Sequence, residues 1–276
     1  MNDELKGEIP VVFVMDRNYI PYATVATHSL LLNSLNNLKI YWILPKEDLL
    51  LASACLARLN INRPNKLRGN ISLVGVNTDM FSTWKESGHI LQSTYYKLLI
   101  PQCIDHKKII YIDCDTLVLG DLMDLYNTDM GEYAIGGVPD PWGSSTTKVS
   151  FDNTDVYVNG GVLLMNLEVL RYDNFFEKSK DIYEIYKEKI TWCDQCLINK
   201  YAENRKYILD SRWNRQIFSG HTDDKTWELI VLKESPKIMH FIGPIKPWKK
   251  GCNPKIIDFW FNYGKETNLF KIGRSE

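Results

Sequence analysis

The chain has 276 residues, of which 45% are hydrophobic and 12% aromatic. This length supplies enough apolar side chains for one large core or two small ones. The formal net charge is −1, and a phosphate-binding surface usually carries a basic excess, so the composition gives no reason to expect nucleic acid as a partner.

The composition also bears on where the protein works. The N-terminal segment MNDELKGEIPVV contains acidic residues and lacks the apolar core of a secretory signal. No stretch approaches the ~20 consecutive apolar residues of a membrane-spanning helix. The six cysteines are scattered among apolar neighbours, and no second ligand pair accompanies Cys193 and Cys196. We therefore expect reduced thiols and a cytoplasmic protein.

The first half of the chain alternates between strand-like and helical patterns. In chain order these are a strand at 11–15, a helix at 24–35, a strand at 38–44, a helix at 46–59, a strand at 71–76, a helix at 92–99 and a strand at 108–112. This alternation predicts an α/β fold with a mostly parallel sheet covered by helices on both faces.

The second half is less regular. We predict strands at 132–138 and 156–165, helices at 168–187 and 194–202, a strand at 238–242 and a helix at 255–263. The segment 139–153, PDPWGSSTTKVSFDN, is rich in turn-forming and small polar residues. Its length favours a mobile loop or a lid that covers a binding site. The alternative is a plain surface loop.

Acidic residues follow two of the predicted parallel strands. Asp16 follows the first strand, and Asp113 follows the strand at 108–112. Ligands of such sheets bind beyond the carboxyl ends of the strands, so both aspartates are candidate site residues.

The strongest local signal is the apolar run that ends in Asp113-Cys114-Asp115. Two neighbouring carboxylates at the end of a buried strand repel each other and lose hydration, and a divalent cation relieves both costs. Hard oxygen ligands favour Mg²⁺ or Mn²⁺. If the strand continues, residues i and i+2 share one face and both can reach one ion, which could bridge to a diphosphate.

A third ligand could come from His240, which closes a strand-like segment. Gly243 and Lys246 follow it, and they could admit and neutralise a phosphate. The segment alone fits a structural histidine before a proline-stiffened loop equally well. The other four histidines, at positions 28, 89, 106 and 221, are expected to be structural.

Six segments together carry a family resemblance. They are VVFVMDRNYIPY (11–22), STYYKLLIP (93–101), IIYIDCDTLVLGDL (109–122), NGGVLLMNL (159–167), WCDQCLIN (192–199) and HFIGPIKPW (240–248). In order and approximate spacing, the chain resembles the retaining glycosyltransferases of family 8. This group of bacterial lipopolysaccharide galactosyl- and glucosyltransferases also includes glycogenin.

The resemblance implies a GT-A fold in a single domain spanning residues 1–276. Residues 9–122 would form the nucleotide-binding half and residues 123–276 the donor-sugar and acceptor half. The implied activity is metal-dependent transfer of galactose or glucose from a UDP-sugar to a saccharide hydroxyl, with retention, in cell-surface polysaccharide or glycolipid synthesis. Retention could arise by front-face attack, which we prefer, or through a covalent intermediate on Asp194.

The resemblance also implies roles for individual residues. Mn²⁺, or Mg²⁺ in its place, would be held by Asp113, Asp115 and His240. The donor-binding residues would also include Val14, Asp16, Asn18 and Tyr19 at the uridine, Cys114, Asn159, and Gly243 and Lys246 at the diphosphate. Asp140, Asp194 and Gln195 would face the reacting sugar. Lys97 stands where the family often has arginine, so it keeps the charge without the bidentate fork.

Two other functions remain open. A sugar-nucleotide nucleotidyltransferase would also use a sheet and a divalent cation, but its glycine-rich phosphate loop is missing from MDRNYIPY. A non-catalytic UDP-sugar-binding protein is the second. Acceptors in the family are often lipid-linked, so we expect at most peripheral contact with the inner face of the cell membrane. The short C-terminal end, NLFKIGRSE, departs from the basic, aromatic tail of many family members. The oligomeric state is left open.

Overall fold

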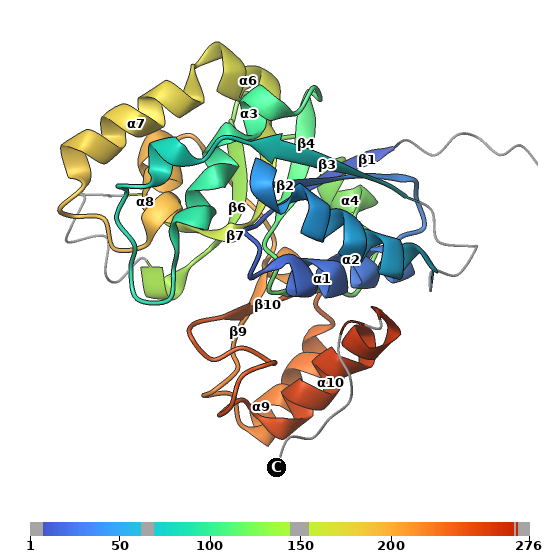
Figure 1. The fold of residues 1–276 in the computed structure, drawn as a ribbon. Helices are drawn as coiled ribbons and strands as arrows, with labels where there is room; N and C mark the ends of the chain where they lie inside the picture. The colour runs from blue at the N-terminus through green and yellow to red at the C-terminus, as the bar shows by residue number, and fades with distance from the viewer. Residues whose placement is uncertain (1–7, 62–68, 144–154, 268, 270–276) are drawn as a thin grey trace, which may run out of the picture.

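The computed structural model describes residues 8–61, 69–143, 155–267 and 269. Its centre is a seven-stranded sheet with strand order β3-β2-β1-β4-β7-β6-β8 (Figure 1). The strands are β1 (Ile9–Val14), β2 (Leu38–Pro45), β3 (Asn70–Val76), β4 (Lys108–Ile112), β6 (Ile135–Pro139), β7 (Val158–Asn166) and β8 (Lys206–Ile208). Only β7 runs antiparallel to its neighbours, so the predicted mostly parallel sheet is confirmed.

Helices cover both faces of this sheet. On one face, Val11 and Phe13 of β1 pack in a cluster with α1 (Ile20–Asn33) and α2 (Leu49–Ile61). Val12 and Val14 point to the other face, toward the helical turns η3 (Gln92–Leu99) and the helices α7 (Phe175–Tyr186) and α8 (Cys193–Tyr201). Burial on both sides explains why the strands are continuous apolar runs.

A smaller sheet lies beside the first and was not predicted from the sequence. It consists of β5 (Thr116–Val118), β10 (Ile238–Ile242) and β9 (Arg215–Phe218), with β10 in the middle. The helices α9 (Asp224–Leu229) and α10 (Pro254–Gly264) lie together against it at the foot of Figure 1. β10 pairs antiparallel with β5, and this register sets His240 opposite Thr116, next to Asp115.

Several predicted elements differ from the structure. The single helix predicted at 168–187 is wrong, because α6 (Leu167–Tyr172) ends before α7 begins and Asn174 between them has a left-handed φ of 52°. Residues 92–99 form 3₁₀ turns that lead into α3 (Ile100–Cys103). The strands predicted at 132–138 and 156–165 are each shifted by one to three residues along the chain.

The remaining elements are short. They are α4 (Met123–Tyr126), η1 (Lys46–Asp48), η2 (Asp79–Phe81), η4 (Ser211–Trp213), η5 (Ile230–Glu234) and η6 (Lys265–Thr267). Most of the predicted lid, residues 144–153, lies outside the described residues; Pro139 ends β6, and residues 141–143 are helical.

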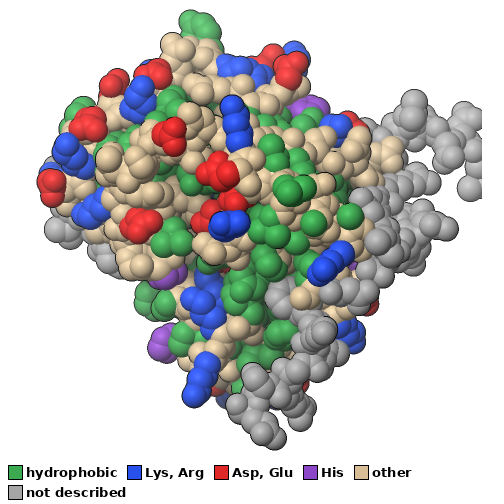
Figure 2. All heavy atoms as spheres, viewed as in Figure 1, with side chains coloured by type: hydrophobic (Ala, Val, Ile, Leu, Met, Phe, Trp, Pro, Cys, Tyr) green, Lys and Arg blue, Asp and Glu red, His purple; other side chains and the backbone are tan. Residues whose placement is uncertain are grey.

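The surface agrees with a net charge near zero. On the face shown in Figure 2, acidic and basic side chains are intermixed over the upper part, where α7 lies in Figure 1. In the described part of the chain, no helix has the length and apolar character needed to cross a membrane.

Candidate active site

A cavity opens where β1, β4 and α8 reach one edge of the large sheet, beside β10 of the small one. All but two of the residues predicted for the site line it: Val14, Tyr19, Lys97, Asp113, Cys114, Asp115, Asp140, Asn159, Asp194, Gln195, His240, Gly243 and Lys246. Asp16 and Asn18 are outside this lining, and Asp16 Oδ1 accepts a hydrogen bond from the Asn18 backbone N–H at 2.8 Å. The cavity lies at the carboxyl ends of β1 and β4, as expected for such sheets.

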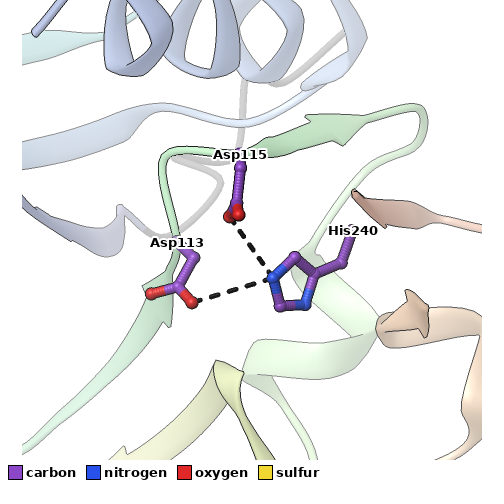
Figure 3. A group of neighbouring side chains, drawn as sticks. All are labelled: Asp113, Asp115 and His240. Carbon is purple, nitrogen blue, oxygen red and sulfur yellow. Dashed lines mark ion pairs between the residues drawn. The ribbon is translucent and has the colours of Figure 1, made fainter. Parts of the chain in front are cut away.

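Asp113, Asp115 and His240 converge at the cavity wall (Figure 3). His240 Nε2 lies 3.7 Å from Asp113 Oδ2 and 3.3 Å from Asp115 Oδ1. One ligand atom from each residue falls within 4.8 Å of the others. The strand-face explanation for the aspartate pair is wrong, because β4 ends at Ile112 and Cys114-Asp115 form a turn before β5. The turn, rather than strand alternation, aims both carboxylates at the histidine.

The second oxygen of each carboxylate is already engaged by the protein. Tyr111 Oη donates to Asp113 Oδ1, and Lys97 Nζ lies 3.4 Å from the same oxygen. Lys246 Nζ lies 2.6 Å from Asp115 Oδ2. Burial alone would raise the pKa of Asp115, but Lys246 and His240 outweigh it and hold that pKa below its usual range. Each carboxylate therefore keeps one oxygen for a shared cation, and two such oxygens with an imidazole suit a divalent metal.

Gly161, in the first half of β7, provides the space for this cluster. Its backbone C=O accepts a hydrogen bond from Asp113 N–H at 2.7 Å. A Cβ atom built on Gly161 would lie 2.1 Å from His240 Cε1 and 2.8 Å from Asp113 Oδ2. A side chain here would displace two of the candidate ligands, so the position requires glycine.

Lys97 and Asp194 form a buried ion pair beside the candidate ligands. Lys97 Nζ lies 2.8 Å from Asp194 Oδ2 and 3.0 Å from the Gly160 carbonyl oxygen. Burial lowers the pKa of Lys97, but Asp113 and Asp194 outweigh it and raise the pKa overall. Burial raises the pKa of Asp194, against the effect of Lys97. Asp194 lies in the first turn of α8, whose N-cap is Trp192.

Asp140, Asn159 and Gln195 are joined in one polar network. Asp140 Oδ2 accepts from Asn159 Nδ2 at 3.1 Å and from Gln195 Nε2 at 3.0 Å. Gln195 Oε1 accepts from the Gly160 backbone N–H at 2.8 Å. Buried polar groups held in this way have fixed orientations, so the network presents a defined polar surface to the cavity.

The cavity wall also contains neutral polar groups near the aspartates. Burial and nearby carboxylates raise the pKa of Tyr19 far above its usual range, so its phenol is neutral. Burial likewise keeps the pKa of the Cys114 thiol high, and its Sγ donates to the Val14 carbonyl oxygen at 3.3 Å. Gly243 has a φ of 80°, a conformation that glycine adopts without strain.

The sequence missed some of the cavity wall. His89, expected to be structural, lines the cavity, and its pKa is lowered by burial and by Lys246. Trp142 and Phe218 also line it and pack edge to face with ring centres 5.2 Å apart. His89 and Phe218 lie outside the motifs used for the resemblance, whereas Trp142 lies in the segment 139–153 that was predicted as a lid.

The cysteine pair near the cavity is structural in its contacts. Cys193 and Cys196 are buried free thiols. Cys196 Sγ accepts from the Trp192 backbone N–H at 3.3 Å, and Tyr157 Oη lies at the same distance from it.

Comparison with known proteins identifies the family of this chain. The chain is 30% identical over 215 residues to general stress protein A of Bacillus subtilis (strain 168), covering 74% of this chain and 75% of that protein. It is 27% identical to the glycosyltransferase GlyE of Streptococcus pneumoniae serotype 4, covering 92% of this chain and 60% of GlyE. The chain therefore spans less than two thirds of GlyE.

A solved structure of the galactosyltransferase LgtC, in complex with donor and acceptor sugar analogues, superposes on this chain with a TM-score of 0.78. The two are 24% identical, and the match covers 96% of this chain and 98% of LgtC. This likeness shows that the fold is of the GT-A type. The family model for glycosyl transferase family 8 matches residues 10–252, and the chain belongs to that family.

Proposed function

We propose that this glycosyltransferase moves a hexose, galactose or glucose, from a UDP-sugar to a saccharide or glycolipid hydroxyl with retention of configuration. Mn²⁺, or Mg²⁺ in its place, would be held by Asp113, Asp115 and His240. The observation that carries the proposal is their convergence, with one ligand atom of each within 4.8 Å of the others. Such a cation, when bound, offsets the charge that develops on a departing diphosphate.

The residues around the three ligands would bind the donor. Lys246 is buried and adds positive charge beside the cation site, where the phosphates would lie. Gly243 lets the backbone approach them closely. Tyr19 offers an aromatic ring that could stack on the uracil base, with Val14 and Cys114 beside it. Asp16 and Asn18 would reach the ribose from outside the cavity wall.

The reacting sugar would lie against Asp140, Asn159, Asp194 and Gln195. Asp194 is 3% exposed and paired with Lys97 at 2.8 Å. Attack by this carboxylate on the sugar would form a neutral ester and leave the buried charge of Lys97 without its Asp194 partner, which is costly. This supports front-face attack by the acceptor over a covalent intermediate on Asp194. Gln195 and Asp140 would then orient sugar hydroxyls.

The family supports a proposal about the acceptor and the setting. We propose a role in cell-surface polysaccharide or glycolipid synthesis by a cytoplasmic enzyme with at most peripheral membrane contact. The donor and acceptor sugar analogues bound to LgtC support a saccharide acceptor.

A UDP-release assay tests the function. Purified protein is incubated with a panel of UDP-sugars, Mn²⁺ and saccharide acceptors, and the Asp113→Asn variant is compared with Asp124→Asn, whose aspartate is exposed on α4. Asp113→Asn should reduce release by ~100-fold or more, because metal stabilisation of the leaving group is worth several kcal/mol. Asp124→Asn should behave as the wild type.

Three results would contradict the proposal. If Asp113→Asn released UDP at the wild-type rate with Mn²⁺ present, the assignment of Asp113 as a metal ligand would be wrong. Pyrophosphate release from UTP and a hexose 1-phosphate would indicate a nucleotidyltransferase. UDP-sugar binding without UDP release from any donor would indicate a non-catalytic binding protein.

A further inference from the structure

We propose that Asn214 is a positioning residue that fixes the tautomer of His240, so that the unprotonated Nε2 faces Asp113 and Asp115. Asn214 lies just before β9, outside every motif used above, and its side chain contacts His240 at the ring edge opposite the two aspartates. That this positioning serves metal binding rests on the proposed metal-dependent function. The hydrogen-bond pattern itself is derived from the geometry alone.

The argument begins at a backbone group whose role is fixed. The Gly161 backbone N–H can only donate, and it lies 2.9 Å from Asn159 Oδ1. The oxygen end of the Asn159 amide is thereby identified. Its other end, Nδ2, donates to Asp140 Oδ2 at 3.1 Å. Turning the Asn159 amide over would set its NH₂ group against the Gly161 N–H and its oxygen against the carboxylate, so only one orientation is possible.

The orientation of Asn159 then decides that of Asn214. One end of the Asn214 amide lies 2.9 Å from Asn159 Oδ1, which is an acceptor, so this end must be the donor Nδ2. The other end is therefore Oδ1, and it lies 3.0 Å from His240 Nδ1.

The orientation of Asn214 in turn decides the histidine tautomer. An amide oxygen only accepts, so Nδ1 of His240 must carry the proton. In a neutral imidazole Nε2 then has its lone pair free, and that atom faces Asp115 Oδ1 at 3.3 Å and Asp113 Oδ2 at 3.7 Å. In this neutral form three acceptor atoms face one another, an arrangement that a cation bound between them would satisfy.

Burial makes each hydrogen bond in this chain costly to lose. Asn214 is 1% exposed, His240 4% and Asn159 6%, so bulk water does not replace a lost partner. A wrong amide orientation or the wrong tautomer would leave buried donors and acceptors unpaired, which is costly. Asn159 also joins Asp140, so one chain of hydrogen bonds couples the candidate metal ligand His240 to the polar network proposed for the donor sugar.

Two substitutions at position 214 separate the acceptor role from bulk. Asn214→Leu has similar volume but offers no acceptor to His240. Asn214→Asp keeps an oxygen for the Nδ1–H and loses the donor to Asn159. Asn36→Leu is the matched control, because Asn36 is a buried amide, 6% exposed, that bonds to Asp121 away from the cavity.

The readout is Mn²⁺ binding to the metal-free full chain, measured by titration with MnCl₂ and the electron paramagnetic resonance signal of free Mn²⁺. Asn214→Leu should weaken Mn²⁺ binding ~10- to 100-fold, which is the usual effect of removing the hydrogen-bond partner of a metal-ligating histidine. Asn214→Asp should stay within ~3-fold of the wild type, since carboxylates commonly hold such histidines. Asn36→Leu should bind as the wild type does. Equal binding by Asn214→Leu and wild type, or equal weakening by Asn214→Asp and Asn214→Leu, would overturn the proposal.

A second measurement reads the ring directly in the wild-type chain. In ¹⁵N-histidine-labelled wild-type protein without metal, two-bond ¹H–¹⁵N correlations report the tautomer of each ring, and His240 is assigned by its disappearance in His240→Gln. We expect the Nδ1–H tautomer at His240; the Nε2–H tautomer would overturn the inference. If the wild type shows the expected tautomer but binds no Mn²⁺, the proposed metal dependence fails and the role of Asn214 in fixing the ring stands.

Discussion

At the scale of single residues, the proposed metal site is defined by the groups that hold its ligands from behind. Tyr111 and Lys97 engage Asp113, Lys246 engages Asp115, and Asn214 engages His240. Each ligand is left with one free atom directed at the same point. Side chains so restrained are positioned before any ligand arrives, which reduces the ordering needed on binding.

The sequence identified some of these residues and not others. The carboxylate pair was predicted from its position after an apolar strand, whereas His240 needed the family resemblance to decide between a ligand and a structural residue. Asn214 and His89 gave no signal, because their roles depend on contacts between segments distant in the chain. The catalytic and donor-binding roles of the predicted residues stay predictions.

Gly161→Ala tests how tightly the site is packed. The new methyl group would lie 2.1 Å from His240 Cε1, so the ring must move. We expect UDP release to fall ~100-fold, the cost of a misplacement of about 1 Å. Gly160→Ala is the matched control, because its methyl group would make ordinary contacts, with Gln195 Cβ at 3.4 Å and with Asp194 Oδ2 and Gln195 Cγ at 3.5 Å. Equal activity of the two variants would show that Gly161 does not constrain the site.

Lys97→Met tests the buried ion pair. The side chain of Lys97 is 3% exposed. Removing its ammonium group leaves the carboxylates of Asp194 and Asp113 without this positively charged partner. We expect the free energy of unfolding, measured by urea denaturation without metal, to fall by about 3–5 kcal/mol, as when one partner of a buried pair is removed. Lys255→Met breaks an exposed pair with Glu228 and should change stability little. A loss no larger than that of Lys255→Met would refute the structural role of Lys97.

At the scale of elements, the sequence predicted what long periodic segments determine. The strands β1, β2 and β4 were found because burial on both faces makes them apolar runs, and the edge strand β3, mostly half-buried, was found as well. The strand β10 was predicted at its observed bounds, but the small sheet around it was missed because β5 and β9 have three and four residues, too few for a periodic signal. The turn at Asp113–Asp115 was read as strand because the apolar run resumes at once in β5.

The break between α6 and α7 occurs at Asn174, and the hydrophobic periodicity of the sequence did not reveal it. Asn174 is exposed and has a φ of 52°, and asparagine tolerates this left-handed conformation better than most residues. We expect Asn174→Ala to lower the free energy of unfolding by about 1 kcal/mol, while Asn174→Gly should not lower it. Urea denaturation of both variants is the measurement. An alanine variant as stable as the glycine variant would mean that residues 173–174 can adopt helical geometry, as the sequence suggested.

At the scale of the whole molecule, the candidate site joins the two sheets. Asp113 and Asp115 lie in the connection from β4 of the large sheet to β5 of the small one, and His240 lies on β10 of the small sheet. Strands from both sequence halves, β1 to β4 and β6 to β8, share the large sheet. This supports our proposal that the chain forms one domain with a nucleotide-binding half and an acceptor half.

A cation held across two sheets should stabilise the folded chain. Mn²⁺ at about 100 times its dissociation constant should raise the free energy of unfolding by ~2.7 kcal/mol, because the ligands converge only when the chain is folded. The comparison is urea denaturation with Mn²⁺ and with a chelator, for the wild type and for Asp115→Asn. The increase should disappear in Asp115→Asn, and an equal increase in both would show that Mn²⁺ binds elsewhere.

The most direct test of the account is an anomalous-scattering map from crystals of the wild-type chain grown with Mn²⁺ and UDP. The account predicts one strong peak within about 2.6 Å of Asp113 Oδ2, Asp115 Oδ1 and His240 Nε2, in contact with the diphosphate. A diphosphate bound in the cavity with no peak at these three atoms, or a peak ligated by other residues, would contradict it.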